Sequence, residues 1–162
     1  MINIVQKIYI NAEINKIWAY ITDFSLSLNF NRFHTSLEIP LNYSLGKMDK
    51  FTINHNFGFG NYTMVAEIKD YLPPNQISIT EYCPDNITKG FPHTIIFQIE
   101  PSLERSKLIY TVSGTYGGSV QDISFKPILK GVMKEELLKI KNAIESSEIT
   151  HNTMTTKTVK PI

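Results

Sequence analysis

Hydrophobic residues in the C-terminal third of the chain recur every three or four positions. Such spacing places them on one face of a single helix, and it predicts an amphipathic helix over residues 123–147. A long helix of this kind needs one large apolar surface, and a curved antiparallel sheet wrapped around it is the natural partner. The apolar stripe consists of Phe125, Ile128, Leu129, Val132, Met133, Leu137, Ile140 and Ile144. Lysine residues alternate with Glu135, Glu136 and Glu145 along this helix, and we assign these charged residues to its solvated face.

Most of the chain before this helix alternates between apolar and polar residues, which is the pattern of half-buried strands. Glycine, proline and asparagine separate the alternating segments, as in the Pro73-Pro74-Asn75 break. A helix is predicted over residues 12–22 and a second short helix or turn over 25–34. Strands are predicted over residues 2–10, 36–41, 48–57, 62–71, 76–83, 91–100 and 107–116. Short sequential strands joined by tight turns favour an antiparallel meander, so the expected class is α+β.

Length and composition set limits on the kind of protein. The chain has 162 residues, of which 42% are hydrophobic and 19% charged, so we expect one globular domain over residues 1–148. The polar, threonine-rich segment 149–162 is expected to form a mobile C-terminal tail. The formal net charge is only +1, which favours neither nucleic acid nor an anionic membrane as the main partner.

The only cysteine is Cys83, so an intrachain disulfide and a cysteine-based metal site are both excluded. The N-terminal segment alternates and carries charge, unlike a signal peptide or a membrane span. We therefore expect a cytoplasmic location without stable membrane insertion. The sequence leaves the oligomeric state open.

Three stretches of the sequence resemble the START-like, helix-grip superfamily, also called SRPBCC, and within it the polyketide cyclase/dehydrase and lipid-transport group. The first is IYINAEINKIWAYITDF (residues 8–24), with Trp18 and Asp23 in their usual places. The second is residues 46–82, where a hairpin ends in a Tyr-x-Pro-Pro break. The third is the final helix. The resemblance spans residue 2 to about residue 148, and the first helix departs from it by lacking a proline at its start.

This resemblance implies a helix-grip fold, in which a seven-stranded curved antiparallel sheet wraps around the long C-terminal helix and two short helices close one end. It also implies an internal cavity between sheet and helix that binds hydrophobic ligands. Some members catalyse cyclisation or dehydration, and many only carry or sense a ligand. No cofactor is implied.

Alternation places several polar side chains on the concave, mostly apolar face of the predicted sheet, as a pocket for a small amphipathic molecule requires. His55 falls between Ile53 and Phe57, and Glu81 follows Ile77 and Ile79. The expected catalytic candidates are His55, His93, Glu81 and Tyr110. The expected ligand-binding residues are Phe33, His34, His55, Phe57, Met64, His93, Phe97, Tyr110, Tyr116, Ile128, Val132 and Met133.

Each candidate also has a purely structural interpretation. An inward histidine is more often a hydrogen-bonded core residue than a catalytic one, and Glu81 near a strand end fits either burial or exposure. The histidines at 34, 55 and 93 could in principle supply three zinc ligands, but they come from separated segments without short His-x-x-x-His spacing. We therefore predict no metal site.

Two functions follow, and the sequence leaves both open. The first is binding or transport of a hydrophobic or aromatic small molecule in the internal cavity. The second is a cofactor-independent polyketide cyclase/dehydratase-like enzyme of the lyase or isomerase type, in which histidine, glutamate and tyrosine act as acid and base. A partner-binding module, like the chaperone-activator branch of the fold, is a third possibility without a clear basic docking face. For both the binding function and the enzyme, we expect the N-terminal half of the last helix to cover the cavity.

Overall fold

The structure is a computed structural model that describes residues 1–40, 45–58, 60–86, 89–102 and 105–155. Seven antiparallel strands form one sheet in the order β1-β7-β6-β5-β4-β3-β2. The strands are β1 (Ile2–Ile10), β2 (His34–Glu38), β3 (Lys50–Asn56), β4 (Asn61–Leu72), β5 (Gln76–Tyr82), β6 (His93–Pro101) and β7 (Ser106–Gly114). The helices are α1 (Ile14–Thr22), α2 (Phe24–Ser27), the 3₁₀ helix η1 (Leu28–Phe30) and α3 (Ser119–Thr155).

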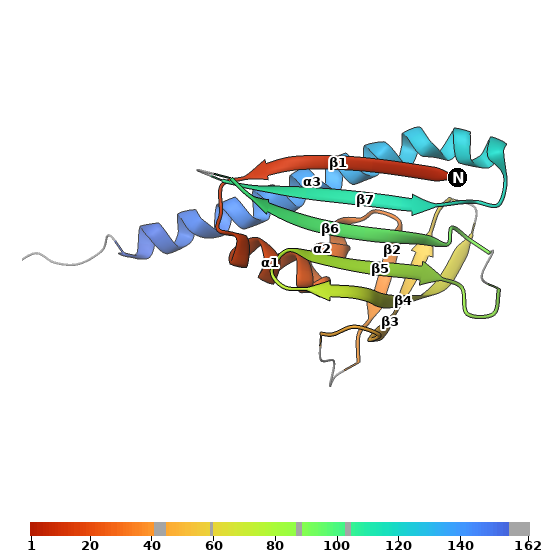
Figure 1. Ribbon diagram of the computed structural model, residues 1–162, viewed down its shortest axis with the longest axis horizontal. Coiled ribbons are helices and arrows are strands. Elements are labelled where there is room, and N and C mark those ends of the chain that lie inside the picture. The colour runs from red at the N-terminus through yellow and green to blue at the C-terminus, as the bar shows by residue number, and fades with distance from the viewer. Residues whose placement is uncertain (41–44, 59, 87–88, 103–104, 156–162) are drawn as a thin grey trace, which may run out of the picture.

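This arrangement confirms the helix-grip prediction. The sheet curves and twists so that β2 and β3 run in a different direction from β1, and α3 lies along its concave side (Figure 1). β3 to β7 form a meander in which sequential strands pair, while β1 closes the sheet against β7 and β2 forms the opposite edge. Alternation buries one face of each strand, because successive side chains in a strand point to opposite sides.

Helix α3 fills the concave side of the sheet with the predicted stripe. Seven of the predicted residues are buried, whereas Ile128 is 51% exposed. α3 begins four residues before the predicted start and ends eight residues after the predicted end. No glycine or proline occurs between Val132 and Thr155, so the sequence contains no helix-breaking residue over this part of α3. The segment predicted as a tail is therefore helical up to Thr155, and its residues 156–162 lie outside the described residues.

The short helices close one end of the sheet. α1 buries Ile17, Trp18 and Ile21, and the side chain of Asp23 caps α2 by accepting a hydrogen bond from the Ser25 amide. β2 starts two residues earlier than predicted, because the turn after η1 is tight and delivers the chain directly to the sheet. No helix among the described residues is long and apolar enough to cross a membrane.

The start of α3 is fixed to the sheet by Asp122. Its carboxylate accepts hydrogen bonds from the Tyr116 amide and the Thr115 hydroxyl, and it pairs with the N-terminal ammonium group at 2.7 Å. A carboxylate in the first turn also interacts favourably with the positive end of the helix dipole. These contacts hold the first turns of α3 over the ends of β1 and β7.

Gly114 in β7 should be intolerant of any side chain. It pairs with His93 in β6, and a Cβ atom added at Gly114 would lie 2.6 Å from both the His93 Cβ and the Pro92 carbonyl oxygen. Gly114→Ala should therefore lower the free energy of unfolding, measured by urea denaturation, by about 1–3 kcal/mol. As a control, Gly131→Ala in α3 meets no atom within 4 Å and should raise it by about 0.5–1 kcal/mol. Equal stabilities for the two variants would contradict the tight approach of β6 and β7.

Candidate functional site

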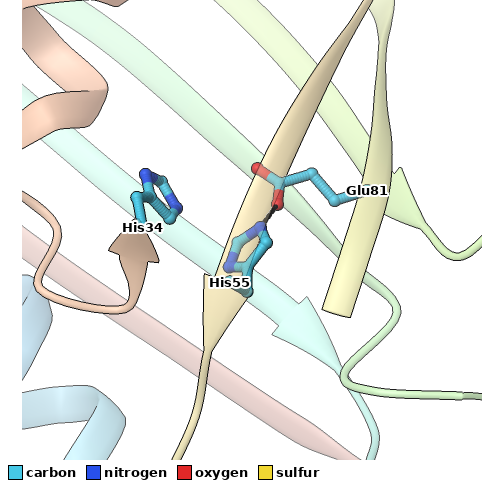
Figure 2. Close-up of side chains that lie close together, drawn as sticks. All are labelled: His34, His55 and Glu81. Carbon is cyan, nitrogen blue, oxygen red and sulfur yellow. Dashed lines mark ion pairs between the residues drawn. The ribbon is translucent and has the colours of Figure 1, made fainter. Parts of the chain in front are cut away.

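Four polar side chains meet inside the sheet, and we call them the His–Glu cluster: His34, His55, Glu81 and His93. The Nε2 atom of His55 lies 2.8 Å from Oε2 of Glu81, and Nε2 of His93 lies 3.7 Å from the same oxygen. The ring centroids of His34 and His55 are 4.6 Å apart. Figure 2 shows His34, His55 and Glu81 pointing toward one another from different strands.

Strand register brings these residues together in two pairs. His34 in β2 is the cross-strand partner of His55 in β3, and Glu81 in β5 is the partner of His93 in β6. The curvature of the sheet then turns the two pairs toward each other across β4. Because Glu81 is completely buried, the structure settles the open question of its exposure in favour of burial.

Backbone carbonyl groups fix the rings of two of the histidines. Nδ1 of His34 lies 2.7 Å from the Leu28 carbonyl oxygen, and Nδ1 of His93 lies 2.6 Å from the Phe91 carbonyl oxygen. A carbonyl oxygen only accepts, so in both rings Nδ1 carries the hydrogen and donates it. The remaining nitrogen of each ring, Nε2, then presents a lone pair. The turn that holds His34 is stabilised by Asn31, whose side-chain oxygen accepts a hydrogen bond from the Phe33 amide.

The central contact of the cluster is close but lacks hydrogen-bond geometry. Within the described part of the chain, neither ring nitrogen of His55 and neither carboxylate oxygen of Glu81 has a hydrogen-bond partner. Buried polar atoms in folded proteins are almost always partnered, so four such atoms in two adjacent residues are exceptional. They make this cluster a candidate functional site.

Burial and neighbouring charges set the protonation of the cluster. Burial lowers the pKa of His34 to about 4 and also lowers the pKa of His93, so both rings are neutral near pH 7. Burial alone would raise the pKa of Glu81, but the imidazoles of His93, His55 and His34, when they carry a proton, outweigh burial and lower the pKa to about 2. Ionisation of Glu81 is therefore linked to protonation of the rings around it, while burial favours the neutral form of His34 and His93.

A second buried carboxyl group, Glu136 of α3, faces the sheet near this cluster. Its Oε2 atom accepts hydrogen bonds from the Tyr110 hydroxyl at 3.1 Å and the Asn31 side-chain amide at 3.4 Å. Burial, aided by the negative charge of Glu81, raises the pKa of Glu136 to about 8. Tyr110, a predicted catalytic residue, is thus hydrogen-bonded to Glu136.

The sequence-based interpretation of Glu136 was wrong. It was assigned with Glu135 and Glu145 to the solvated face of the last helix, but it is completely buried. A signal was present, because position 136 lies four residues after Val132 and four before Ile140, on the apolar stripe itself.

An apolar pocket of about 430 Å³ opens beside the first turns of α3. Ligand sites in proteins commonly have volumes of about 300–1,000 Å³ and mostly apolar walls, so its size suits a small molecule. Three of its aromatic side chains pack on one another, with ring centroids of Tyr116 and Phe125 4.4 Å apart and of Phe57 and Tyr116 6.0 Å apart. The pocket is lined by Phe57, Tyr62, Tyr116, Val120, Gln121, Ser124, Phe125 and Ile128.

A much smaller void of about 10 Å³ lies against the His–Glu cluster. Its volume is close to the minimum of about 10–15 Å³ that one water molecule needs. Phe57 lines both the void and the pocket, so its aromatic ring lies between the two spaces. We call this ring, with the aromatic rings packed against it, the aromatic layer. The void is lined by Asn31, Phe33, His34, His55, Phe57, Phe91, His93, Tyr110, Val112 and Leu129.

The structure divides the predicted ligand-binding residues into three groups. Phe57, Tyr116 and Ile128 line the pocket, and Phe33, His34, His55, Phe57, His93 and Tyr110 line the void. Met64, Phe97, Val132 and Met133 are buried in the core and line neither space. The sequence analysis did not identify the pocket residues Tyr62, Val120, Gln121 and Ser124. Val120, Gln121 and Ser124 lie in α3 outside its apolar stripe, so the helical periodicity did not predict that they would line a pocket.

Comparison with known proteins supports the fold. The chain matches no protein-family model and no curated protein. Among solved structures, a conserved protein from Geobacillus kaustophilus is similar, with a TM-score of 0.68 and 20% identity over 90% of this chain and 97% of that one. The di-domain ARO/CYC StfQ from the steffimycin biosynthetic pathway has a TM-score of 0.69 and 13% identity, over 90% of this chain and 51% of that one. The Aha1 dimer from Colwellia psychrerythraea has a TM-score of 0.62 and 20% identity, over 90% and 97% of the two chains.

The raised pKa of Glu136 should make stability depend on pH. The folded chain binds this proton with a pKa of about 8, against an ordinary value of 4.5, so stability should fall as the pH rises from about 4.5 to about 8. Glu136→Gln cannot ionise and should remove this contribution, whose slope is at most about 1.4 kcal/mol per pH unit. Urea denaturation of both proteins at several pH values measures the difference.

The groups that face Glu136 are Tyr110 of β7, Asn31, Glu81 of β5 and Lys139 of α3, and all of them remain in the variant. The matched control is Glu135→Gln, which changes the neighbouring exposed carboxylate of the same helix and should leave the pH dependence of stability almost unchanged. Parallel pH profiles for Glu136→Gln and the unmodified protein would show that Glu136 is ionised in the folded chain.

Proposed function

We propose that this protein binds or transports a small hydrophobic or aromatic molecule in the pocket beside the first turns of α3. The observation that carries the proposal is an apolar, aromatic-walled space of about 430 Å³. Phe57, Tyr62, Tyr116 and Phe125 offer flat surfaces on which an aromatic ring can stack. Binding would bury this exposed apolar wall and release its water, which is the main driving force for a ligand of this class.

Polar groups at the pocket restrict the ligand further. The hydroxyl oxygen of Tyr116 is buried and has no hydrogen-bond partner among the described residues. Burial raises the pKa of Tyr116 above its ordinary value, so the hydroxyl stays protonated. Gln121 and Ser124 also line the pocket, and their side chains suit a ligand with one carbonyl or hydroxyl oxygen. Among the described residues that line the pocket there is no Lys, Arg, Asp or Glu, which favours a neutral molecule.

Two further considerations support this function. StfQ, whose printed description is a di-domain ARO/CYC of a biosynthetic pathway, has the same fold, so the fold is compatible with small-molecule chemistry. The Aha1 dimer also shares the fold, but the open apolar pocket favours a small molecule over a protein partner here. A cytoplasmic location remains part of the proposal and is compatible with Cys83, which is buried and free.

The second candidate is a cyclase/dehydratase-like enzyme, and it is favoured by the convergence of the His–Glu cluster. An ionised carboxylate beside imidazole rings can remove a proton from an enolisable ligand and return it elsewhere. The void beside the cluster holds at most about one water molecule, so a substrate would have to displace the aromatic layer that contains Phe57. The enzyme thus requires a rearrangement that ligand binding in the open pocket does not, and we therefore prefer the binding function.

The pocket should be blocked by a large side chain at Ser124, which is exposed and lines it. Ser124→Trp should weaken binding of N-phenyl-1-naphthylamine, a neutral aromatic fluorophore, by more than about tenfold, because the indole would occupy the space of the ligand. Fluorescence titration measures the dissociation constant. The control is Ile123→Trp, which adds the same side chain one position away at a residue that does not line the pocket. Equal affinities of the two variants, or no saturable binding by the unmodified protein, would contradict the proposal.

The two candidate functions predict different fates for a natural ligand. Native mass spectrometry of the purified protein should reveal a co-purified apolar molecule. Incubating that molecule with the unmodified protein and with Glu81→Gln then separates the functions. Binding to both proteins without conversion by either supports a carrier, whereas conversion by the unmodified protein alone, with binding retained in the variant, supports the enzyme.

A further inference from the structure

We propose that His34, His55 and Glu81 form a binding site for a divalent transition-metal ion, with His93 beside its open position. The ligating atoms of these three residues all lie within 4.8 Å of one another. Two imidazole nitrogens and one carboxylate oxygen are a ligand set used for Zn²⁺ and for non-haem Fe²⁺. This proposal departs from the sequence-based expectation of no metal, and it is independent of the ligand proposed for the apolar pocket.

The unpartnered buried atoms of Glu81 and His55 are the first argument for a cation. Glu81 is completely buried, and its ion-pair contacts within the described chain are to the imidazoles of His55 and His93 only. A buried carboxylate without lysine, arginine or a full set of hydrogen bonds has a high cost in free energy. A bound cation supplies the missing charge and takes up an oxygen lone pair at the same time.

The geometry of the central contact is the second argument. Nε2 of His55 and Oε2 of Glu81 are 2.8 Å apart, yet neither atom has a hydrogen-bond partner of regular geometry among the described residues. Two ligands of one metal ion approach each other in this way, because each directs its lone pair at the ion and neither donates to the other. With metal–ligand bonds of about 2.1 Å, tetrahedral ligands lie roughly 3.4 Å apart, so small shifts of these side chains suffice.

The orientation of His34 is the third argument. Its Nδ1–H donates to the Leu28 carbonyl oxygen, which leaves the lone pair of Nε2 available. Metal-binding histidines in proteins characteristically donate their second ring nitrogen to a backbone carbonyl or a carboxylate, which fixes both tautomer and ring plane. His34 thus makes the backbone hydrogen bond that is typical of a metal-binding histidine, and the acceptor is the carbonyl group of Leu28 in η1.

A site with three protein ligands keeps one position for water. The void of about 10 Å³ at the cluster is large enough for a single water molecule, and His93 lines it. Because Nδ1 of His93 donates to the Phe91 carbonyl oxygen, its Nε2 can accept a hydrogen bond from a metal-bound water. His93 is therefore assigned as a positioning residue beside the metal.

The competing explanation is a metal-free ion pair between protonated His55 and Glu81. An ion pair of this kind would use at most one oxygen of Glu81, and it would leave Oε1 of Glu81 and Nδ1 of His55 buried without a partner among the described residues. It would also leave His34 without any role in the cluster, although its second nitrogen is directed there by the Leu28 carbonyl. The metal accounts for both observations.

Cobalt titration of the untagged full-length protein, treated with EDTA and dialysed, tests the site. We expect one Co²⁺ per chain, visible absorption bands from the bound ion, loss of these bands when Zn²⁺ is added, and a higher melting temperature in the presence of Zn²⁺. Glu81→Gln, which keeps the shape of the side chain and removes its charge, should weaken Co²⁺ binding by at least about tenfold. His34→Gln, at a partly exposed position of β2, should do the same and is the second variant if Glu81→Gln does not fold.

Two matched controls separate this site from adventitious binding. Glu136→Gln removes another completely buried carboxyl group, and His151→Gln removes the remaining histidine of the chain. Both should bind Co²⁺ with an affinity close to that of the unmodified protein, and circular dichroism should show that every variant is folded. The proposal is overturned if the unmodified protein binds no stoichiometric Co²⁺. It is equally overturned if binding persists in both Glu81→Gln and His34→Gln, or if it is lost in His151→Gln alone.

Discussion

The complete burial of the Glu81 carboxylate is the constraint around which the interior of this protein is arranged. An ionised group of this kind is stable inside a fold only when positive charge or hydrogen-bond donors surround it. Here the strands of a curved sheet bring three imidazoles toward it from β2, β3 and β6, but no hydrogen-bond donor reaches its oxygens within the described chain, and the proposed cation would supply the missing charge. The rings of His34 and His93 are held in place by backbone carbonyl groups, so the cluster is preorganised rather than assembled on demand.

Helix α3 has two different relationships with the sheet. From Leu129 to Ile144 the residues of its apolar stripe pack into the concave face, and Glu136 adds a buried polar contact to Tyr110. Its first turns are held at the edge by Asp122, where Ile128 stays exposed and the apolar pocket opens. The stripe is thus buried from Leu129 to Ile144, whereas a pocket remains beside the first turns of the helix. The pocket and the His–Glu cluster are neighbours separated by an aromatic layer, so a ligand in one would lie close to the chemistry of the other.

Periodicity predicted the elements of this fold well because each element depends on local sequence. The alternation of strands β3, β5 and β6 placed His55, Glu81 and His93 on the buried face, and the structure confirms each placement. Element boundaries were less accurate, as the later end of α3 shows. Glu136 was assigned to the surface because its charge was given more weight than its position on the helical stripe. Burial of that carboxyl group depends on Tyr110 and Asn31, which come from distant parts of the chain.

The sequence by itself determined the secondary structure, the α+β class and the inward direction of most candidate side chains, because 2.0- and 3.6-residue periods follow from backbone geometry alone. Only the tertiary structure decided which inward groups meet. His34, His55 and Glu81 lie on separate strands, and their distances depend on cross-strand register and sheet curvature, which a single sequence does not encode in any short spacing. The location of the pocket was likewise decided by packing, since it lies where the first turns of α3 and the sheet fail to fill the space between them.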